Sequence, residues 1–274
     1  MCLGTSLRAQ REEAKSPLVD SFFKVIDLIP TGYSLSEVLT HFNPVDIVRR
    51  KIAQRYAQKG SNIYGRRLDG EIVKAITTAA KSRARSQTAL DLALQNKQYG
   101  SKANFTNLVR QLKTFLFAGH DTSAAAISWV YYYLSCNPEV LKKLRAEHDA
   151  IFGPFADTPT LANKLSSEPK LLAKLDYTVA VIREALRLRP VADGAREGYP
   201  GYIIRTASGR EFDAGATMIS PQHLALHTDP AVWGPSAFEF DPDRFMNGKV
   251  PMAYMPFATR PRDCIGRNLV YLEV

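Results

Sequence analysis

Apolar residues recur at helical spacing through most of the first 190 positions of the chain. In residues 17–100 this pattern predicts short helices. One begins after Asn43, which fits an N-cap, and another covers about 70–94. Residues 104–135 contain almost no helix breaker, and they predict one long helix of roughly 45 Å at 1.5 Å per residue.

Prolines separate the helices that follow. Pro138 begins an amphipathic helix that continues to about residue 152, and residues 153–169 are expected to form a loop. Residues 170–189 predict a further helix. Pro190 ends it, because proline has no backbone N–H to donate.

The periodicity then changes. Strand-like residues at 202–206 and 216–220 predict a hairpin over 202–220. Residues 221–266 are rich in proline, glycine and aromatic residues, and irregular chain of this length is usually functional or wrapped around something. We therefore expect residues 1–274 to form a single, mainly α domain with a small β-sheet.

The composition is that of an ordinary globular protein, with 45% hydrophobic and 23% charged residues among 274. The three cysteines, Cys2, Cys136 and Cys264, are odd in number and widely spaced. They favour neither a disulfide framework nor a structural zinc site, which indicates a reducing, intracellular compartment. Residues 1–15 are polar and lack the apolar region of a signal peptide.

The formal net charge of +9 comes from scattered basic residues. A solvated basic surface is the simplest interpretation and an acidic protein partner is the alternative. No nucleic-acid-binding motif accompanies the charge, so no nucleic-acid partner is expected. The most apolar run, 115–136, contains His120 and Asp121, and such groups are costly inside a bilayer. A buried helix is therefore favoured there over a membrane-inserted one.

Cys264 stands in the stretch 257–266 with Phe257, Arg262 and Gly266. A cysteine is often only a small buried apolar residue. A thiolate, however, needs positive charge or a metal to persist. An arginine can clamp the carboxylates of a flat anionic cofactor, a glycine lets the backbone approach its ring, and Phe257 can shield it from water. Ligation of a metal or an iron-bearing cofactor and simple packing both remain open from these residues alone.

A second candidate is the stretch 118–123 inside the long predicted helix. Gly119 weakens a helix interior, and Thr122 can donate to the carbonyl group four residues earlier. Such residues favour a kink that admits water, where Asp121 and Thr122 could relay protons. Close packing of helices through small residues is the alternative.

Glu184 and Arg187 lie three residues apart on the helix before Pro190. Most pairs of this spacing are weak surface ion pairs. The apolar residues around them favour burial instead, and Arg244 could then complete a polar network.

These stretches occur in the order found in the cytochrome P-450 family of heme-thiolate monooxygenases, which the chain resembles from about residue 20 to its end. The resemblance is to eukaryotic, fungal-like members, and a match to 227–233 supports it. Four motifs carry it: 118–123 is similar to the family's distal-helix motif, 184–187 to its helix-K motif, 242–245 to its meander and 257–266 to its heme loop.

The resemblance implies a partial cytochrome P-450 fold, with the distal helix at 104–135, helix K at 170–189, and the meander and heme loop within 221–266. It also implies roles for matching residues. Glu184, Arg187 and Arg244 would hold the fold behind the heme. The residues implied at the cofactor are Cys264 as axial thiolate of the heme iron, Arg262 on a propionate, Ala118 and Gly119 beside the oxygen site, and Thr122 with Asp121 delivering protons.

The implied reaction inserts one atom of O2 into a small lipophilic substrate, such as a polyketide, terpenoid or fatty acid of secondary metabolism. Thiolate donation favours O–O cleavage. Electrons would come from NADPH through a separate reductase, for which the Arg262 and Arg267 side is a candidate docking surface. The family is usually anchored to the endoplasmic reticulum, and we expect no anchor in this chain. The alternative is a truncated, non-catalytic remnant with weak or no heme binding.

The chain departs from the family pattern in three respects. It is expected to start within the family's fold, to stop soon after the cysteine, and to carry Arg260 where the family has glycine. If that position needs a left-handed backbone, a non-glycine residue costs roughly 1–2 kcal/mol.

Arg260→Gly is therefore expected to improve heme retention, because glycine adopts the left-handed conformation without a steric cost. Heme occupancy after gel filtration measures this effect in both proteins. Equal occupancy would show that residue 260 has no such requirement.

Overall fold

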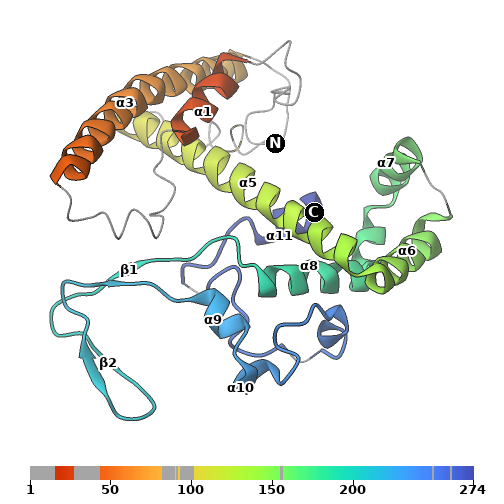
Figure 1. Cartoon of the computed structure of the whole chain (residues 1–274). Helices are drawn as coiled ribbons and strands as arrows, with labels where there is room; N and C mark the ends of the chain where they lie inside the picture. The colour runs from red at the N-terminus through yellow and green to blue at the C-terminus, as the bar shows by residue number, and fades with distance from the viewer. Residues whose placement is uncertain are drawn as a thin grey trace. The chain divides into compact units, whose positions relative to one another are not determined.

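The computed structural model describes residues 16–27, 44–81, 90, 92, 102–154, 157–248, 250–259 and 261–274. These residues are mainly helical, with two small antiparallel sheets, which confirms the predicted fold class (Figure 1). Contacts divide the chain into two compact units, Met1–Phe117 and Ala118–Val274. The prediction of a single domain stays a prediction. In the described ranges no helix is both long enough and apolar enough to cross a membrane.

The first unit contains α1 (Pro17–Asp27), α3 (Pro44–Lys81) and the beginning of α5 (Lys102–Cys136). Their apolar faces meet in one core, because the stripes at helical spacing remove those side chains from water together. The buried core residues are Leu18, Phe22, Leu68, Ile72, Ile76, Leu90, Leu108, Val109 and Leu112.

The predicted helix start after Asn43 agrees with α3, which begins at Pro44, but the prediction of a separate helix over 70–94 is wrong. α3 is a single helix that runs through Gly65 and Gly70. Each internal glycine costs about 1 kcal/mol relative to alanine, but Leu68, Ile72 and Ile76, on both sides of Gly70, are buried, and their packing outweighs that cost. Asn43 itself lies outside the described residues.

In the second unit α5 ends at Cys136 and α6 (Pro138–Phe152) begins after Asn137, as predicted. The predicted loop 153–169 instead contains α7 (Thr158–Ser167). Asp157 caps this helix by accepting a hydrogen bond from the Thr160 N–H at 2.9 Å. The helix was missed because its ten residues are mostly polar and none of them is buried.

The predicted helix 170–189 is divided into two elements. Residues 169–174 form the 3₁₀ helix η3 (Pro169–Lys174), and α8 (Asp176–Leu188) follows. The N-cap residue of α8, Leu175, has no side chain that can cap the helix. Glu147 of α6, which is far away in the sequence, caps it instead. Its carboxylate accepts hydrogen bonds from the N–H groups of Tyr177 at 2.7 Å and Thr178 at 2.9 Å. An acidic group at this end also complements the helix dipole.

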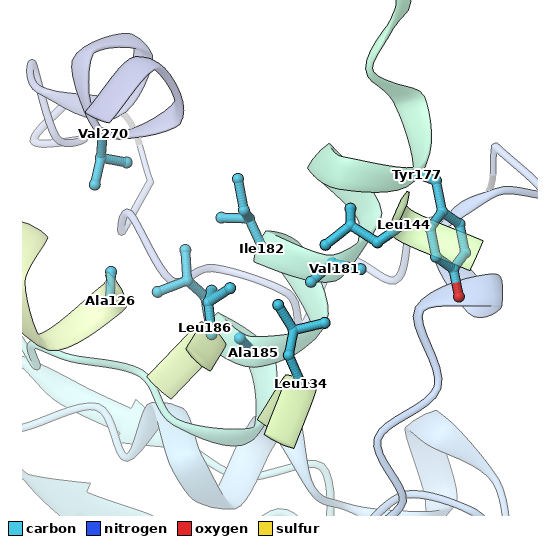
Figure 2. Close-up of a cluster of buried hydrophobic side chains, with 10 residues drawn as sticks. Ala126, Leu134, Leu144, Tyr177, Val181, Ile182, Ala185, Leu186 and Val270 are labelled. Carbon is cyan, nitrogen blue, oxygen red and sulfur yellow. The ribbon is translucent and has the colours of Figure 1, made fainter. Parts of the chain in front are cut away.

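α8 is the centre of the second unit. Its apolar residues pack against α5, α6 and the C-terminal helix α11 (Arg267–Glu273), as Figure 2 shows. Nearly the whole circumference of α8 is buried, which is typical of a central helix. The buried cluster consists of Ala126, Val130, Leu134, Leu144, Tyr177, Val181, Ile182, Ala185, Leu186 and Val270.

The hairpin predicted over 202–220 is correct in its first strand and wrong in its second. β2 (Ile203–Arg205) pairs with β3 (Glu211–Asp213), whereas β4 (Met218–Ile219) pairs with β1 (Arg196–Glu197). β3 was overlooked because acidic residues are depleted in strands. Here Glu211 is stabilised by an ion pair with Arg205 across the ladder at 2.6 Å.

After β4 the chain is mostly irregular, as predicted. Its short helical turns are α9 (His223–His227), α10 (Pro230–Trp233) and the 3₁₀ helix η4 (Pro242–Phe245). A small core of Ala180, Trp233, Ala237 and Phe245 holds this segment against α8.

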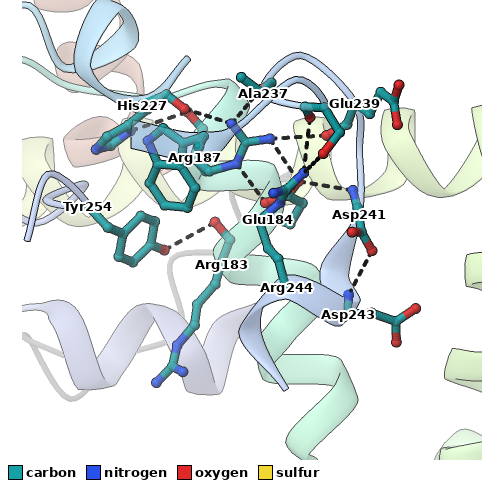
Figure 3. Close-up of polar contacts among 12 residues, drawn as sticks. Arg183, Glu184, Arg187, His227, Ala237, Glu239, Asp241, Asp243, Arg244 and Tyr254 are labelled. Carbon is teal, nitrogen blue, oxygen red and sulfur yellow. Dashed lines mark hydrogen bonds and ion pairs between the residues drawn. The ribbon is translucent and has the colours of Figure 1, made fainter. Parts of the chain in front are cut away.

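A buried ion pair connects the irregular segment to α8. Glu184 and Arg187 are both fully buried. Arg187 Nε donates to Glu184 Oε2 at 2.7 Å, and one terminal nitrogen donates to Glu184 Oε1 at 2.8 Å. The remaining donors bind the carbonyl oxygens of His227 and Ala237, each at 2.6 Å, and of Glu239 at 3.0 Å. All five guanidinium N–H groups therefore have an acceptor (Figure 3).

Glu184 has partners beyond Arg187. Its Oε1 atom also accepts hydrogen bonds from Arg244 Nε at 3.1 Å and from the Asp241 N–H at 2.9 Å. The guanidinium of Arg187 lies over the ring of Trp233, 4.9 Å from its centroid. The structure thus confirms that the pair is buried and that Arg244 joins it. Because its polar atoms are already paired, the network holds the fold and is not offered to a ligand.

Arg187→Lys is expected to lower the free energy of unfolding by roughly 3 kcal/mol or more, because one ammonium group cannot reach five acceptors and a buried carboxylate loses its bidentate partner. Urea denaturation measures the loss. Arg183→Lys is the matched control: Arg183 lies on the same helix, its side chain points away from the network (Figure 3), and its replacement should change stability by about 0.5 kcal/mol or less. Equal losses in the two variants would show that the network is dispensable.

Candidate functional site

The loop that carries Cys264 is held by its own backbone. The Cys264 N–H donates to the Phe257 carbonyl oxygen at 2.9 Å, and the Ala258 N–H donates to the Met255 carbonyl oxygen at 3.0 Å. Ala258 has a φ of +57°, in the left-handed region that side chains avoid. This closed, locally strained loop places Cys264 at the surface with a free thiol. The interpretation of Cys264 as a small core residue is therefore excluded.

Phe257 anchors the start of this loop. Its ring packs on the core of the second unit and lies 5.7 Å from the ring of Tyr271 on α11. The Arg267 guanidinium lies over the same ring at 5.8 Å. Phe257 thus joins the loop to the helix that follows the cysteine, while its predicted contact with a cofactor stays a prediction.

The other predicted residues of the loop, Arg262 and Gly266, each lie two positions from Cys264 in the chain. Arg262 is exposed and makes no ion pair with a described residue. A Cβ atom added at Gly266 would lie 3.7 Å from Cys264 Sγ, so a side chain there would stand beside the sulfur. Arg260, for which we expect a backbone cost, lies outside the described residues.

The stretch 118–123 forms part of α5, as predicted. Thr122 Oγ1 donates to the Ala118 carbonyl oxygen at 2.6 Å, which is the predicted back-bond. Ala118 and Asp121 are exposed. A Cβ atom added at Gly119 would meet no atom within 4 Å, so this face of the helix is open.

The structure brings this stretch to the helix that follows Cys264. Ser123 Oγ donates to Glu273 Oε2 of α11 at 2.6 Å. One turn further along α5, Ala126 belongs to the same buried cluster as Val270 of α11. Within the described residues, however, no hydrogen bond or ion pair joins Thr122 or Asp121 to the Cys264 loop.

Two hydrogen bonds near the candidate site were not predicted from the sequence. One is the hydrogen bond between Ser123 and Glu273, two residues with no distinguishing pattern around them. The other is the hydrogen bond from the Met255 N–H to His227 Nε2, at 3.0 Å. His227 had been noted only within a motif match, and nothing in the sequence indicated its partner.

The chain is similar in sequence to proteins of one family. The family model described as Cytochrome P450 matches residues 7–274. The chain is 31% identical to "Cytochrome P450 monooxygenase polC" of Polytolypa hystricis, over 85% of this chain and 44% of that protein. It is 32% identical to "Cytochrome P450 monooxygenase acrF" of Aspergillus aculeatus, over 95% of this chain and 55% of that protein. It is 36% identical to human "Cytochrome P450 4V2", over 71% of this chain and 36% of that protein.

The chain thus spans about half the length of the first curated relatives that it matches. The family model covers nearly all of it, and it includes both the Cys264 loop and the stretch 118–123. On these grounds the chain belongs to the cytochrome P450 family.

Proposed function

We propose that this chain is the part of a heme-dependent monooxygenase that supplies the axial thiolate, from Cys264. The observation that carries the proposal is the exposed thiol at the end of a loop that backbone hydrogen bonds and the Phe257 ring hold in place. Membership of the family supports it, and two of the matched relatives are named monooxygenases.

The residues around the thiol fit a heme. Ile265, Leu269 and Leu272 are large apolar residues that are 83%, 49% and 64% exposed, next to Cys264 in the chain and on the helix that follows it. Exposed apolar side chains are costly in water, and they are suited to cover a flat apolar ring. The exposed Arg262 guanidinium can donate two parallel hydrogen bonds to a propionate of that ring.

When bound, the heme would supply the chemistry that activates O2. Cys264 Sγ would hold the iron as a thiolate, and the loop would keep the sulfur in place. On α5, Thr122 Oγ1 already donates to the Ala118 carbonyl oxygen, so its lone pairs remain free to accept a hydrogen bond from water. The exposed Asp121 carboxylate can exchange protons with solvent, and Thr122 would order the water that carries them.

The substrate class and electron source follow from the family alone. A small lipophilic substrate, O2 and electrons from NADPH through a separate reductase are the expected partners. A non-catalytic chain with weak or no heme binding is the competing hypothesis, and heme ligation separates the two.

The test is the spectrum of the reduced, carbon-monoxide-treated protein after the purified chain has been mixed with heme. The original chain is expected to show the red-shifted Soret band of thiolate ligation. Cys264→Ser should remove this band while the helical circular dichroism stays unchanged, because Cys264 is exposed and supports no core packing. Cys136→Ser, at the other exposed cysteine of the second unit, should keep it. A missing band in the original chain, or equal bands in both variants, would reject the proposal.

A further inference from the structure

His227 connects the buried ion pair to the segment that leads into the cysteine loop. It is the last residue of α9 and is fully buried. Its ring has a polar partner on each nitrogen: Nδ1 lies 3.2 Å from the Arg187 carbonyl oxygen, and Nε2 lies 3.0 Å from the Met255 backbone nitrogen. A buried imidazole with two backbone partners is held in one orientation.

These partners determine the state of the ring. A carbonyl oxygen can only accept, so Nδ1 carries the proton and donates it to the Arg187 carbonyl oxygen. A backbone N–H can only donate, so Nε2 is unprotonated and accepts from Met255. The neutral Nδ1–H tautomer is therefore the one form of His227 that satisfies both contacts.

The contact with Arg187 is reciprocal. The Arg187 side chain donates to the His227 carbonyl oxygen at 2.6 Å, while the His227 ring donates to the Arg187 carbonyl oxygen. Met255 in turn accepts, through its carbonyl oxygen, from the Ala258 N–H in the turn where the cysteine loop begins. A continuous path of hydrogen bonds and short chain segments thus leads from Glu184 and Arg187 to the backbone around Phe257.

We propose that His227 is a positioning residue for the cysteine loop, and that its neutral ring fixes the Met255 backbone from which Phe257 and Cys264 follow. The inference relies on the proposed function only in treating Cys264 as the heme ligand. The contact itself is a property of the chain without heme.

The groups that surround His227 support this assignment. His223 stacks on it at 6.0 Å and pairs with Asp193 at 2.9 Å; Arg187 approaches from α8, and the Tyr254 ring lies at 5.5 Å. Burial lowers the pKa of His227 from 6.5 to about 4. The electrostatic effects of His223 and Arg187 lower this pKa further, while the hydrogen bond to the Arg187 carbonyl oxygen and the Asp193 carboxylate raise it. The ring is thus neutral at physiological pH.

Protonation of His227 therefore opposes folding. In the unfolded chain the histidine takes up a proton below about pH 6.5, whereas in the folded chain it stays neutral until about pH 4. Its contribution to stability is complete above pH 6.5 and is lost as the pH falls from 6.5 to 4. Protonation of His227 over this pH interval should raise the unfolding equilibrium constant on the order of a hundredfold.

Two amide substitutions distinguish the contact made by Nδ1 from the contact made by Nε2. The His227→Asn side chain matches the position of Nδ1 and can reach the Arg187 carbonyl oxygen, but it is too short for Met255. The His227→Gln side chain is one carbon longer and can accept from the Met255 N–H. Hydrogen exchange of the heme-free full chain, followed by NMR at the Met255 amide, tests the difference.

His227→Gln is expected to keep Met255 protection within about threefold of the original chain, and His227→Asn to lower it about tenfold, as expected for one lost hydrogen bond. The Arg189 amide, which donates to the Ala185 carbonyl oxygen at the end of α8, is the internal reference and should change equally in both variants. Equal Met255 protection in Asn and Gln variants would overturn the proposal.

A second measurement uses the unmodified sequence, so it does not depend on whether the variants fold. Met255 protection relative to Arg189 should be constant from pH 7 to 5 and should fall near pH 4, when Nε2 becomes protonated and can no longer accept. A ratio that stays constant to pH 3.5 would contradict the proposal. Neither measurement requires heme, so failure of heme binding would reject the proposed function and leave this inference to be judged by itself.

Discussion

The buried ion pair of Glu184 and Arg187 is the interaction on which the second unit depends. Removing two charges from water is costly, and their mutual attraction offsets that cost only when every remaining donor and acceptor is paired. Arg187 achieves this by binding three backbone carbonyl groups between residues 227 and 239. The requirement to satisfy one side chain therefore determines where an otherwise irregular segment lies against α8.

The cysteine loop is connected to this ion pair and is likewise held by specific contacts. The described residues of this segment belong to no sheet, so their geometry comes from individual contacts. His227 accepts from the Met255 N–H, the Phe257 ring packs near the Tyr271 ring, and the Cys264 N–H donates to the Phe257 carbonyl oxygen. These contacts leave the thiol exposed on a supported loop. A ligand that is held in place before the metal binds loses less conformational freedom on binding, which suits an axial ligand.

Agreement between sequence patterns and structure was closest where periodicity was strong. α5, α6 and the end of α8 shortly before Pro190 were predicted because their signals are local: an apolar stripe and a proline. The errors arose where a weak local signal was overruled by a contact that the linear pattern does not show. α3 continues through Gly70 because the residues on both sides of it are buried, and β3 contains two acidic residues, of which Glu211 pairs with Arg205 across the ladder.

The sequence by itself determined the family and the candidate residues, since the spacing of Cys264 within 257–266 and of Glu184 and Arg187 is visible in the linear chain. Only the tertiary structure decided that the ion pair is buried, that Arg244 joins it, and that His227 reaches Met255. The reason is physical. These contacts join residues that are far apart in the chain and often use backbone N–H and carbonyl groups. Nearly every residue carries those groups, so no sequence pattern marks the ones that will pair.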